Sequence, residues 1–475
     1  MHGKARNSKK KNYPGSERWG GYSAALLSIV ALSAGILLSG CDKRTTRLRY
    51  LVGDPSLNDF YSVEKDSVTM YATPEDKKSG AIECRIYKDE YDIFIKMFRV
   101  LDDETITETY RSKGAGRFGA DFVKKIRSLD EGRFKPGANP AKPLEGLRVA
   151  IDPGHSAGTI DEAIKEDKYV ILFAPDGSKY RFYEARLNLA TARELRALLQ
   201  AKGATVMLTR DAERQVFPVP YDAWVRRDFR STVREKTRDR FITSDEANRL
   251  LRWATPKGIL KFFNSEVEMP CRAKRINEFR PHITVLVHYD ANDIYTVVRD
   301  NSVLVRKALR KRYRTLRERQ DEIRDAANAV SETKRDCCAV FVPGCFLANE
   351  LNPMQSRIEF LRLIISPDLD GSVRYSNYVI DNFTRYLGVP LPDQSYPGAS
   401  TITAGNTGVY ARNFRMTRLV RGALCLGEPL QQNNLKEAPR LAEIDEGKVP
   451  PRVRTVARAY YDAIRKFVLL HLNMP

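Results

Sequence analysis

The chain has 475 residues, of which 42% are hydrophobic, and it contains 22 tyrosines and 20 phenylalanines. This composition excludes a largely disordered protein, and the length allows a large core with two domains and appended segments. Lysine and arginine outnumber acidic residues by 80 to 60, which gives a formal net charge of +20. Such a surplus favours anionic partners, namely acidic lipid headgroups or a polyanionic wall polymer. The sequence contains no nucleic-acid recognition motif, so nucleic acid is not an expected partner.

The N-terminus has the organisation of a bacterial export signal. A positively charged stretch precedes an apolar run, residues 24–38, that is shorter than the about 20 residues of a membrane-spanning helix. The run Leu-Ser-Gly-Cys at 38–41 resembles a lipobox, which predicts a signal peptide over residues 1–41 and lipidation of Cys41. Asp42 resembles an inner-membrane retention signal, so we expect the periplasmic side of the inner membrane, with the outer membrane as the alternative. An uncleaved signal anchor is the other interpretation.

The first part after the signal is expected to be a small β-rich domain over residues 45–129. Short alternating runs at 67–71 and 91–95 predict strands, and the apolar spacing in 118–129 predicts a helix. The role of this domain stays open between wall binding, partner binding and a spacer. Residues 130–146 are dense in proline and glycine, which predicts a linker at a domain boundary.

From residue 147 onward, short apolar runs alternate with helical patterns. The predicted elements are strands at 147–151, 205–208, 283–287, 339–342 and 423–426 and a helix at 186–201. This alternation predicts an α/β domain over residues 147–475, with a sheet flanked by helices on both faces.

Two long stretches interrupt the alternation, at 213–269 and at 293–336. The first is polar and rich in charge, and the second has helical spacing with a strongly basic first half. The second is interpreted as a solvated helical hairpin, as a functional insert near the active site, or as a surface for an anionic polymer.

The cysteines do not predict a structural metal site. Cys41 aside, six of the seven remain, and none forms a C-x-x-C pair, so a zinc ribbon is not expected. Disulfides in an exported protein and buried free thiols both stay open, because spacing does not give connectivity.

Two histidines and one glutamate stand where metal ligands are expected. His155 and His288 each follow a predicted strand, and α/β sheets place their sites at the carboxyl ends of strands. Glu184 begins a predicted helix. Two histidines and one carboxylate form a three-ligand set that leaves the fourth position on zinc for water. His282, in contrast, is interpreted as a core or supporting residue.

Five motifs in order resemble the zinc-dependent N-acetylmuramoyl-L-alanine amidase family (amidase type 3). They lie at 149–155, 183–190, 204–210, 275–292 and 426–434, and they include Asp-Pro-Gly-His, Tyr-Glu-Ala-Arg, Thr-Arg, His-Tyr-Asp-Ala-Asn and Leu-Gly-Glu-Pro. The resemblance implies that His155, Glu184 and His288 bind zinc and that Glu428 is the catalytic glutamate, with Asn434 as the downstream asparagine. It covers the chain from residue 147 onward except for both long inserts.

Three positions depart from the family pattern. Ser156 stands where a glycine is usual, Leu286-Val287 where Ser-Ile is usual, and Leu430-Gln431 where Gly-Phe is usual. None of these changes removes a ligand or Glu428, but they leave the details of substrate recognition open.

The resemblance implies cleavage of the amide between N-acetylmuramic acid and L-alanine of the stem peptide, in cell wall remodelling or division. The residues by themselves indicate only zinc-assisted amide hydrolysis. A catalytically inactive wall-binding lipoprotein and a zinc hydrolase of another amide bond are the alternatives. Some family members carry a helical insert that occludes the zinc, so residues 293–336 are expected to be autoinhibitory or to bind a protein activator.

Overall fold

The computed structural model describes residues 42–134, 139–291, 301–392, 400–402 and 408–472. Residues 46–475 form one compact unit, and residues 1–45 form a separate one. The predicted signal peptide and Cys41 lie outside the described residues. Within the described ranges, no helix combines the length and the hydrophobicity needed to cross a bilayer.

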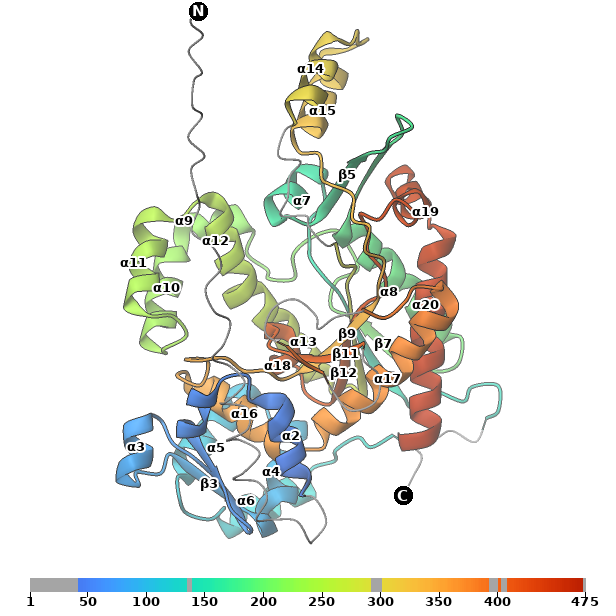
Figure 1. Ribbon diagram of the computed structural model, residues 1–475. Coiled ribbons are helices and arrows are strands. Elements are labelled where there is room, and N and C mark those ends of the chain that lie inside the picture. Colours follow the sequence, from blue (N-terminus) through green and yellow to red (C-terminus); the bar gives the residue numbers. More distant parts are fainter. Residues whose placement is uncertain (1–41, 135–138, 292–300, 393–399, 403–407, 473–475) are drawn as a thin grey trace, which may run out of the picture. The chain divides into compact units, whose positions relative to one another are not determined.

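A seven-stranded mixed sheet forms the centre of the compact unit (Figure 1). Its strands, in spatial order, are β10 (Ser400–Ile402), β11 (Val409–Arg412), β9 (Ala339–Pro343), β12 (Ala423–Glu428), β8 (Ile283–Val287), β4 (Arg148–Pro153) and β7 (Thr205–Leu208). The four strands β12, β8, β4 and β7 run parallel, whereas β9 is antiparallel to β12 and β10 is antiparallel to β11. All five strands predicted for this part of the chain are present.

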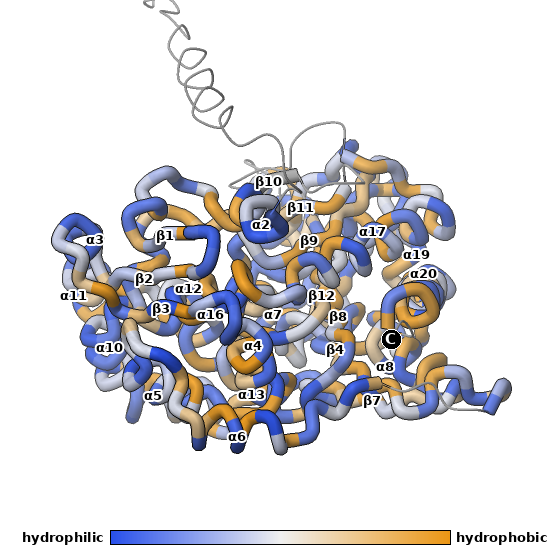
Figure 2. Tube along the Cα trace, turned by 90° about the horizontal axis from the view of Figure 1, so that it is seen from below, coloured by the Kyte–Doolittle hydropathy of each residue, from blue (hydrophilic) through white to orange (hydrophobic). Residues whose placement is uncertain are grey.

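Helices cover both faces of the sheet. One face packs against α8 (Glu184–Gln200) and α17 (Asp368–Leu387), with α20 (Pro451–Phe467) packed against both helices. The opposite face packs against α13 (Met269–Phe279) and α18 (Arg415–Leu419). Hydrophobic residues accordingly concentrate along the strands and the helix sides turned toward them (Figure 2). The predicted α/β sheet flanked on both faces is confirmed.

The N-terminal part contains a small antiparallel sheet with order β1-β2-β3, together with more helix than the sequence predicted. Its elements are α2 (Lys43–Leu51), η1 (Pro55–Phe60), β1 (Tyr61–Val63), β2 (Ser67–Met70), α3 (Pro74–Ser79), β3 (Cys84–Tyr87), η2 (Lys88–Glu90), α4 (Tyr91–Val100), α5 (Asp103–Lys113) and α6 (Ala120–Ser128). The strand predicted at 91–95 is wrong, because these residues begin α4. The alternation there was too short to reveal the helical spacing of the buried residues, which are Ile93, Phe94, Met97, Phe98 and Val100.

The small sheet packs against α16 (Met354–Ile365), which belongs to the later part of the chain. The Arg357 guanidinium of α16 donates two hydrogen bonds of 2.6 Å to the Glu83 carboxylate, and the Tyr110 hydroxyl donates a third at 2.9 Å. Because α16 is buried from residue 356 to residue 365, the N-terminal part and the sheet domain share a core across the predicted 130–146 linker.

The insert at 213–269 folds into helices around its own aromatic core. These are α9 (Tyr221–Arg227), α10 (Phe229–Arg238), α11 (Ser244–Trp253) and α12 (Pro256–Phe263). The rings of Trp224, Phe229, Phe262 and Phe263 form that core. The π-helical segment η3 (Asn264–Glu268) then joins α12 directly to α13, the helix that packs on the sheet face opposite α8 and α17. The insert is therefore attached to the sheet domain by a continuous helical segment.

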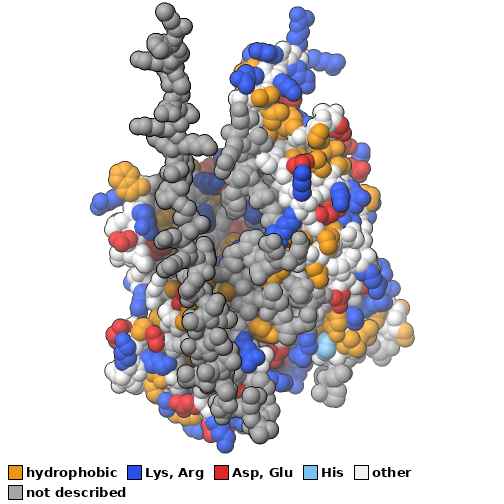
Figure 3. Space-filling view, viewed as in Figure 1, with side chains coloured by type: hydrophobic (Ala, Val, Ile, Leu, Met, Phe, Trp, Pro, Cys, Tyr) orange, Lys and Arg blue, Asp and Glu red, His pale blue; other side chains and the backbone are white. Residues whose placement is uncertain are grey.

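The second insert contains the helical hairpin α14 (Ser302–Arg310) and α15 (Leu316–Ala327), which confirms its predicted helical character. Lysine and arginine side chains gather at its tip (Figure 3). At its base, Lys179 Nζ lies 2.6 Å from Glu322 Oε2 and 2.9 Å from Asp325 Oδ2. Lys179 belongs to the two-stranded sheet of β5 (Tyr169–Phe173) and β6 (Lys179–Tyr183), so the hairpin is anchored there.

The remaining described elements are short: α7 (Ile160–Glu166), α19 (Ala438–Leu441), η4 (Ala442–Glu446) and the π-helical η5 (Val468–Leu472). Six cysteines lie in the part of the chain that the structure describes, with no disulfide among them, and all but Cys271 are buried.

Candidate metal centre and cleft

Three of the predicted site residues lie at the carboxyl ends of adjacent parallel strands. His155 follows β4, His288 follows β8, and Glu428 ends β12. These strands are neighbours in the order β12-β8-β4, and the His288 N–H donates to the Gly427 carbonyl at 3.2 Å. Because the carboxyl ends of parallel strands meet at one edge of a sheet, the topology brings Glu428 beside His288 and His155 near both.

Glu184, the first residue of α8, completes the group. Its Oε1 lies 3.0 Å from His288 Nδ1 and 3.2 Å from His155 Nε2. Metal-ligating atoms of His155, Glu184 and His288 all lie within 4.8 Å of one another. The structure thus brings together the three residues that the sequence predicted as ligands.

The polar atoms at the centre of this group suit a metal ion. His155 Nε2 and Glu184 Oε2 are both buried, and neither has a hydrogen-bond partner among the residues described. Ion-pair contacts do reach both atoms, since His155 Nε2 lies 3.2 Å from Glu184 Oε1 and Glu184 Oε2 lies 3.7 Å from Lys168 Nζ. A bound cation would add the close partner that a buried polar atom ordinarily has. Two imidazole nitrogens and a carboxylate oxygen are donors that zinc accepts in a three-residue site.

The protonation states also suit metal binding. Burial lowers the pKa of the His155 imidazole to about 4, although the Glu184 carboxylate opposes that shift. Burial by itself would raise the pKa of Glu184, but His155, Lys168 and His288 hold it well below its ordinary value. Metal ligands must be neutral imidazole and ionised carboxylate, which are the forms favoured here.

Backbone constraints orient the His155 loop. His155 itself has a positive φ of 58°, and Gly154 packs so closely on the His288 ring that a β-carbon there would overlap it. Two buried arginines bind the carbonyls of this loop. Arg210 donates to the Pro153 and Gly154 oxygens at 3.0 Å, and Arg272 donates to the Pro153 oxygen at 2.9 Å and the His155 oxygen at 2.8 Å.

Two residues near the ligands were missed from the sequence, Glu166 and Arg272. Glu166 Oε2 lies 3.8 Å from His155 Nδ1, and the Ser156 hydroxyl donates to Glu166 Oε1 at 3.2 Å. Burial raises the pKa of Glu166. No local sequence pattern predicts a site role for either residue. Ser156, which stands where the family usually has a glycine, is the hydrogen-bond partner of Glu166.

His155 and His288 open into a cleft of about 900 Å³. The helical insert lines one side of the cleft, from Arg240 to Met269, and the segments 348–356 and 413–418 line another. Glu184 is buried below this cleft, with 1% of its side chain exposed, and Glu428 is not among its lining residues. Residues 301–336, the described part of the second insert, contribute nothing to its lining.

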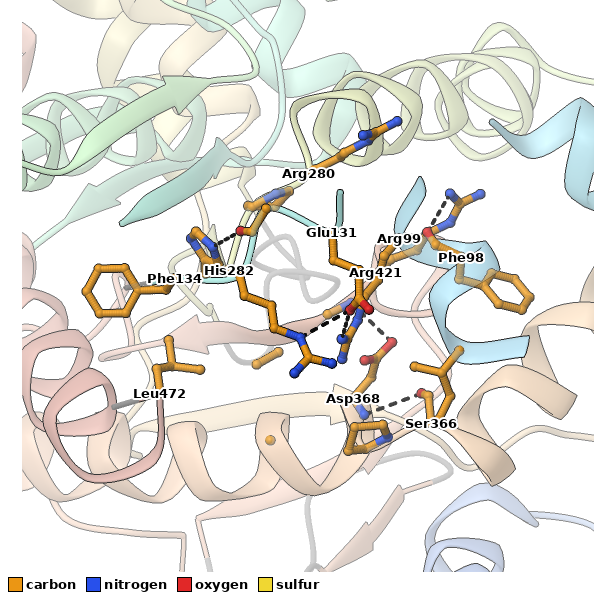
Figure 4. Close-up of a pocket in the computed structure, with 18 of the residues that line it drawn as sticks. Phe98, Arg99, Glu131, Phe134, Arg280, His282, Ser366, Asp368, Arg421 and Leu472 are labelled. Atoms are coloured by element: carbon orange, nitrogen blue, oxygen red, sulfur yellow. Dashed lines mark hydrogen bonds and ion pairs between the residues drawn. The ribbon is translucent and has the colours of Figure 1, made fainter. Parts of the chain in front are cut away.

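His282 lies apart from the three ligands, and Asn434 contacts the end of the second insert. His282 Nδ1 accepts a hydrogen bond from the Arg148 N–H at 2.9 Å, and its Nε2 lies 2.7 Å from the Gly132 oxygen. Both contacts lie at the amino ends of β4 and β8, whereas the ligands lie at the carboxyl ends. It lines a separate cavity of about 510 Å³ (Figure 4). Asn434 donates to the Thr333 oxygen at 3.1 Å. His282 is therefore a supporting residue, as predicted, and Asn434 connects the end of the second insert to the segment after β12.

Comparison with known proteins finds a family similar to this α/β domain. The family model described as N-acetylmuramoyl-L-alanine amidase matches residues 149–352, which is less than half of the chain. A probable cell wall amidase, LytH, from Staphylococcus saprophyticus subsp. saprophyticus is 38% identical over 79 residues. That alignment covers 16% of this chain and 23% of the relative, so the match spans less than a quarter of the relative's length.

Two solved amidase structures are similar at low identity. The CwlD amidase from Clostridioides difficile, solved in complex with the GerS lipoprotein, is 14% identical with a TM-score of 0.32, covering 68% of this chain and 99% of that one. The amidase Ami1 from Mycobacterium smegmatis is 14% identical with a TM-score of 0.35, and the match covers 68% of this chain and 98% of Ami1.

Proposed function

We propose that this protein is a zinc-dependent N-acetylmuramoyl-L-alanine amidase that hydrolyses the amide between N-acetylmuramic acid and L-alanine of the stem peptide, in cell wall remodelling or division. The observation that carries the proposal is the convergence of His155, Glu184 and His288, with ligand atoms within 4.8 Å, in a domain whose residues 149–352 match the amidase family model. Glu428 lies on the strand adjacent to His288 and supplies a carboxylate at the same sheet edge.

The three ligands would hold the ion, which supplies polarisation of the scissile carbonyl and acidification of water. Glu428 then acts as the general base and acid. Its carboxylate accepts a proton from the attacking water and delivers a proton to the amide nitrogen as the carbon–nitrogen bond breaks. The products are a free lactyl carboxylate on the sugar and a peptide with a free L-alanine amine.

The test is digestion of purified peptidoglycan by residues 42–475, with products identified by mass spectrometry. We expect stem peptides that begin with L-alanine, lost after zinc removal and restored by zinc. Glu428→Gln should bind zinc normally and lose cleavage by at least about 100-fold, the usual size of a general acid–base contribution. Products cut at another bond would replace this proposal by a different zinc hydrolase. A folded, zinc-loaded protein that releases nothing would favour the wall-binding alternative.

We further propose that the protein acts on the periplasmic side of the cell envelope, anchored by a lipid on Cys41 with the inner membrane favoured by Asp42. A lipid-labelling experiment with Cys41→Ala tests the anchor, since the label and the membrane fraction should both be lost.

The basic hairpin α14–α15 is proposed as a docking surface for a protein activator. Because its described residues do not line the cleft, we expect deletion of 301–327 to leave the basal rate unchanged and to abolish activation. A raised basal rate would instead indicate autoinhibition.

A further inference from the structure

We propose that the helical insert α9–α12 is a substrate-recognition wall, in which Arg240 and Lys261, together with Lys165 of α7, bind carboxylates of the stem peptide. This inference rests on the proposed amidase function, because it assigns the peptide side of the same cleft. It gives the 213–269 insert, which lies outside the family resemblance, a role in choosing the substrate.

The three cations share the cleft with the metal-site histidines. Lys165, Arg240 and Lys261 line the same cavity of about 900 Å³ as His155 and His288. They come from three separate elements: α7, the turn after α10 and α12. Arg240 has a positive φ of 65° in that turn. Figure 1 shows the insert helices grouped together, with α12 on the side of α7.

The charges that line the cleft are unevenly matched. Every acidic side chain there has an ion-pair or hydrogen-bond partner; Arg272, for example, holds both Asp152 and Glu268. Lys165, Arg240 and Lys261 are exposed and have no ion-pair partner within the described ranges. Glu166 and Glu246 are held by hydrogen bonds from neutral groups of Ser156 and Thr243 rather than by a lysine or arginine. The other basic side chains of the lining form ion pairs, so the three exposed cations are the ones available to attract an anionic ligand.

The cavity around His282 provides a contrast. There Glu131 lies 2.7 Å from Arg99 and 3.5 Å from Arg133, and Asp368 and Arg421 each bind a residue outside the cavity (Figure 4). Its arginines are therefore largely committed to protein partners, whereas the three cations of the catalytic cleft are not.

The insert has a core of its own and is attached to the sheet domain. The aromatic core of the insert buries Trp224 and Phe263, each 1% exposed. Glu268, at the end of η3, accepts hydrogen bonds of 2.8 Å from the Val216 and Phe217 N–H groups. Lys257 of α12 forms an ion pair with Asp167 directly after α7. These contacts anchor the backbone of the insert, from which Arg240 and Lys261 project, to the metal-site side of the cleft.

The ligand chemistry follows from the substrate class. A stem peptide carries free carboxylates at its glutamate residue and at its C-terminus, whereas the glycan strand near the scissile bond is mainly hydroxyl and amide. Ammonium and guanidinium groups form charge-assisted hydrogen bonds with carboxylates that are about twice as strong as neutral ones. Replacing a recognised carboxylate by a carboxamide removes that charge and should weaken binding.

The test compares two muramoyl peptides that differ only at the second residue, D-isoglutamate in one and D-isoglutamine in the other. Binding is measured by calorimetry with zinc-loaded Glu428→Gln protein of residues 42–475, which contains the compact unit 46–475, so that the substrate survives. We expect the carboxylate peptide to bind about tenfold tighter than the amide. Arg240→Gln combined with Lys261→Gln should reduce that ratio to about one, with zinc content unchanged. Arg252→Gln, an exposed change on the same insert outside the cleft lining, is the matched control and should preserve the ratio.

The outcomes separate this inference from the proposed function. Equal binding of both peptides overturns the recognition wall, even if the unmodified protein cleaves peptidoglycan. A ratio that survives the double variant also overturns it. If the unmodified protein cleaves neither peptide, the proposed amidase function fails, whereas a carboxylate preference lost in the double variant still supports the recognition wall as a binding surface.

Discussion

Gly154 offers the sharpest test of the metal centre, because a single added carbon should displace a ligand. A β-carbon at this position would overlap the His288 ring, with even the more distant Nδ1 only 2.7 Å away. Non-bonded carbon contacts lie at about 3.5–4.0 Å, so Nδ1 would have to move by about 1 Å. Metal–ligand distances tolerate only about 0.2 Å. Gly154→Ala should therefore remove His288 from the ligand set.

The expected result is a zinc affinity lowered by more than about 100-fold, since loss of an outer-shell partner alone costs about 10–100-fold. Overpacking at such a site costs about 1–3 kcal/mol, so the protein should still fold. Zinc affinity is measured by competition with a chelator of known affinity, and folding by circular dichroism and denaturant unfolding. Gly119→Ala is the matched control, because Gly119 has a φ of −62° and a β-carbon there meets nothing within 4 Å. A folded Gly154→Ala protein with unchanged zinc affinity would refute the assigned role of His288.

Two further predictions concern stability. Burial by itself would raise the pKa of Asp368, but Arg362 at 2.5 Å and the Gly422 N–H at 3.1 Å bring it below its ordinary value of 3.8. The stability from this carboxylate is complete above pH 3.8 and declines as the pH falls further, toward the lowered folded-state pKa. Asp368→Asn should lower the free energy of unfolding by about 3–5 kcal/mol at pH 7, because Arg362 loses its buried partner. The free energy of unfolding, measured with urea, should also depend less on pH in the acid range than it does for the unmodified protein. An equal loss at pH 3 and pH 7 would contradict this reasoning. Phe263→Ala should reduce the stability of the insert by about 3–5 kcal/mol. Amide hydrogen exchange across residues 221–263 should rise while the zinc content stays constant. Unchanged exchange there would show that the aromatic core does not stabilise the insert.

Local sequence patterns were sufficient for five of the seven strands of the sheet and for the positions of the ligands, whereas β10 and β11 were not predicted. Four of the five predicted strands of the α/β domain are short, mostly buried apolar runs, so their signal lies within the strand itself, and the edge strand β7 is the exception. His155 and His288 are placed by the strands that precede them, and parallel strands present their carboxyl ends at one edge whatever connects them. The strand predicted at 91–95 failed because five residues do not separate a period of 2 from a period of 3.6.

The sequence by itself determined the α/β class, the amidase motifs and the three residues that meet at the sheet edge. Only the tertiary structure decided what surrounds them. Glu166 reaches His155 from a helix between two strands, and Arg272 binds the His155 loop from α13, 117 positions away. The cleft wall belongs to an insert whose own core sets its shape. These contacts join residues distant in sequence, and they depend on chain packing rather than on any local period, so no pattern along the chain could have shown them.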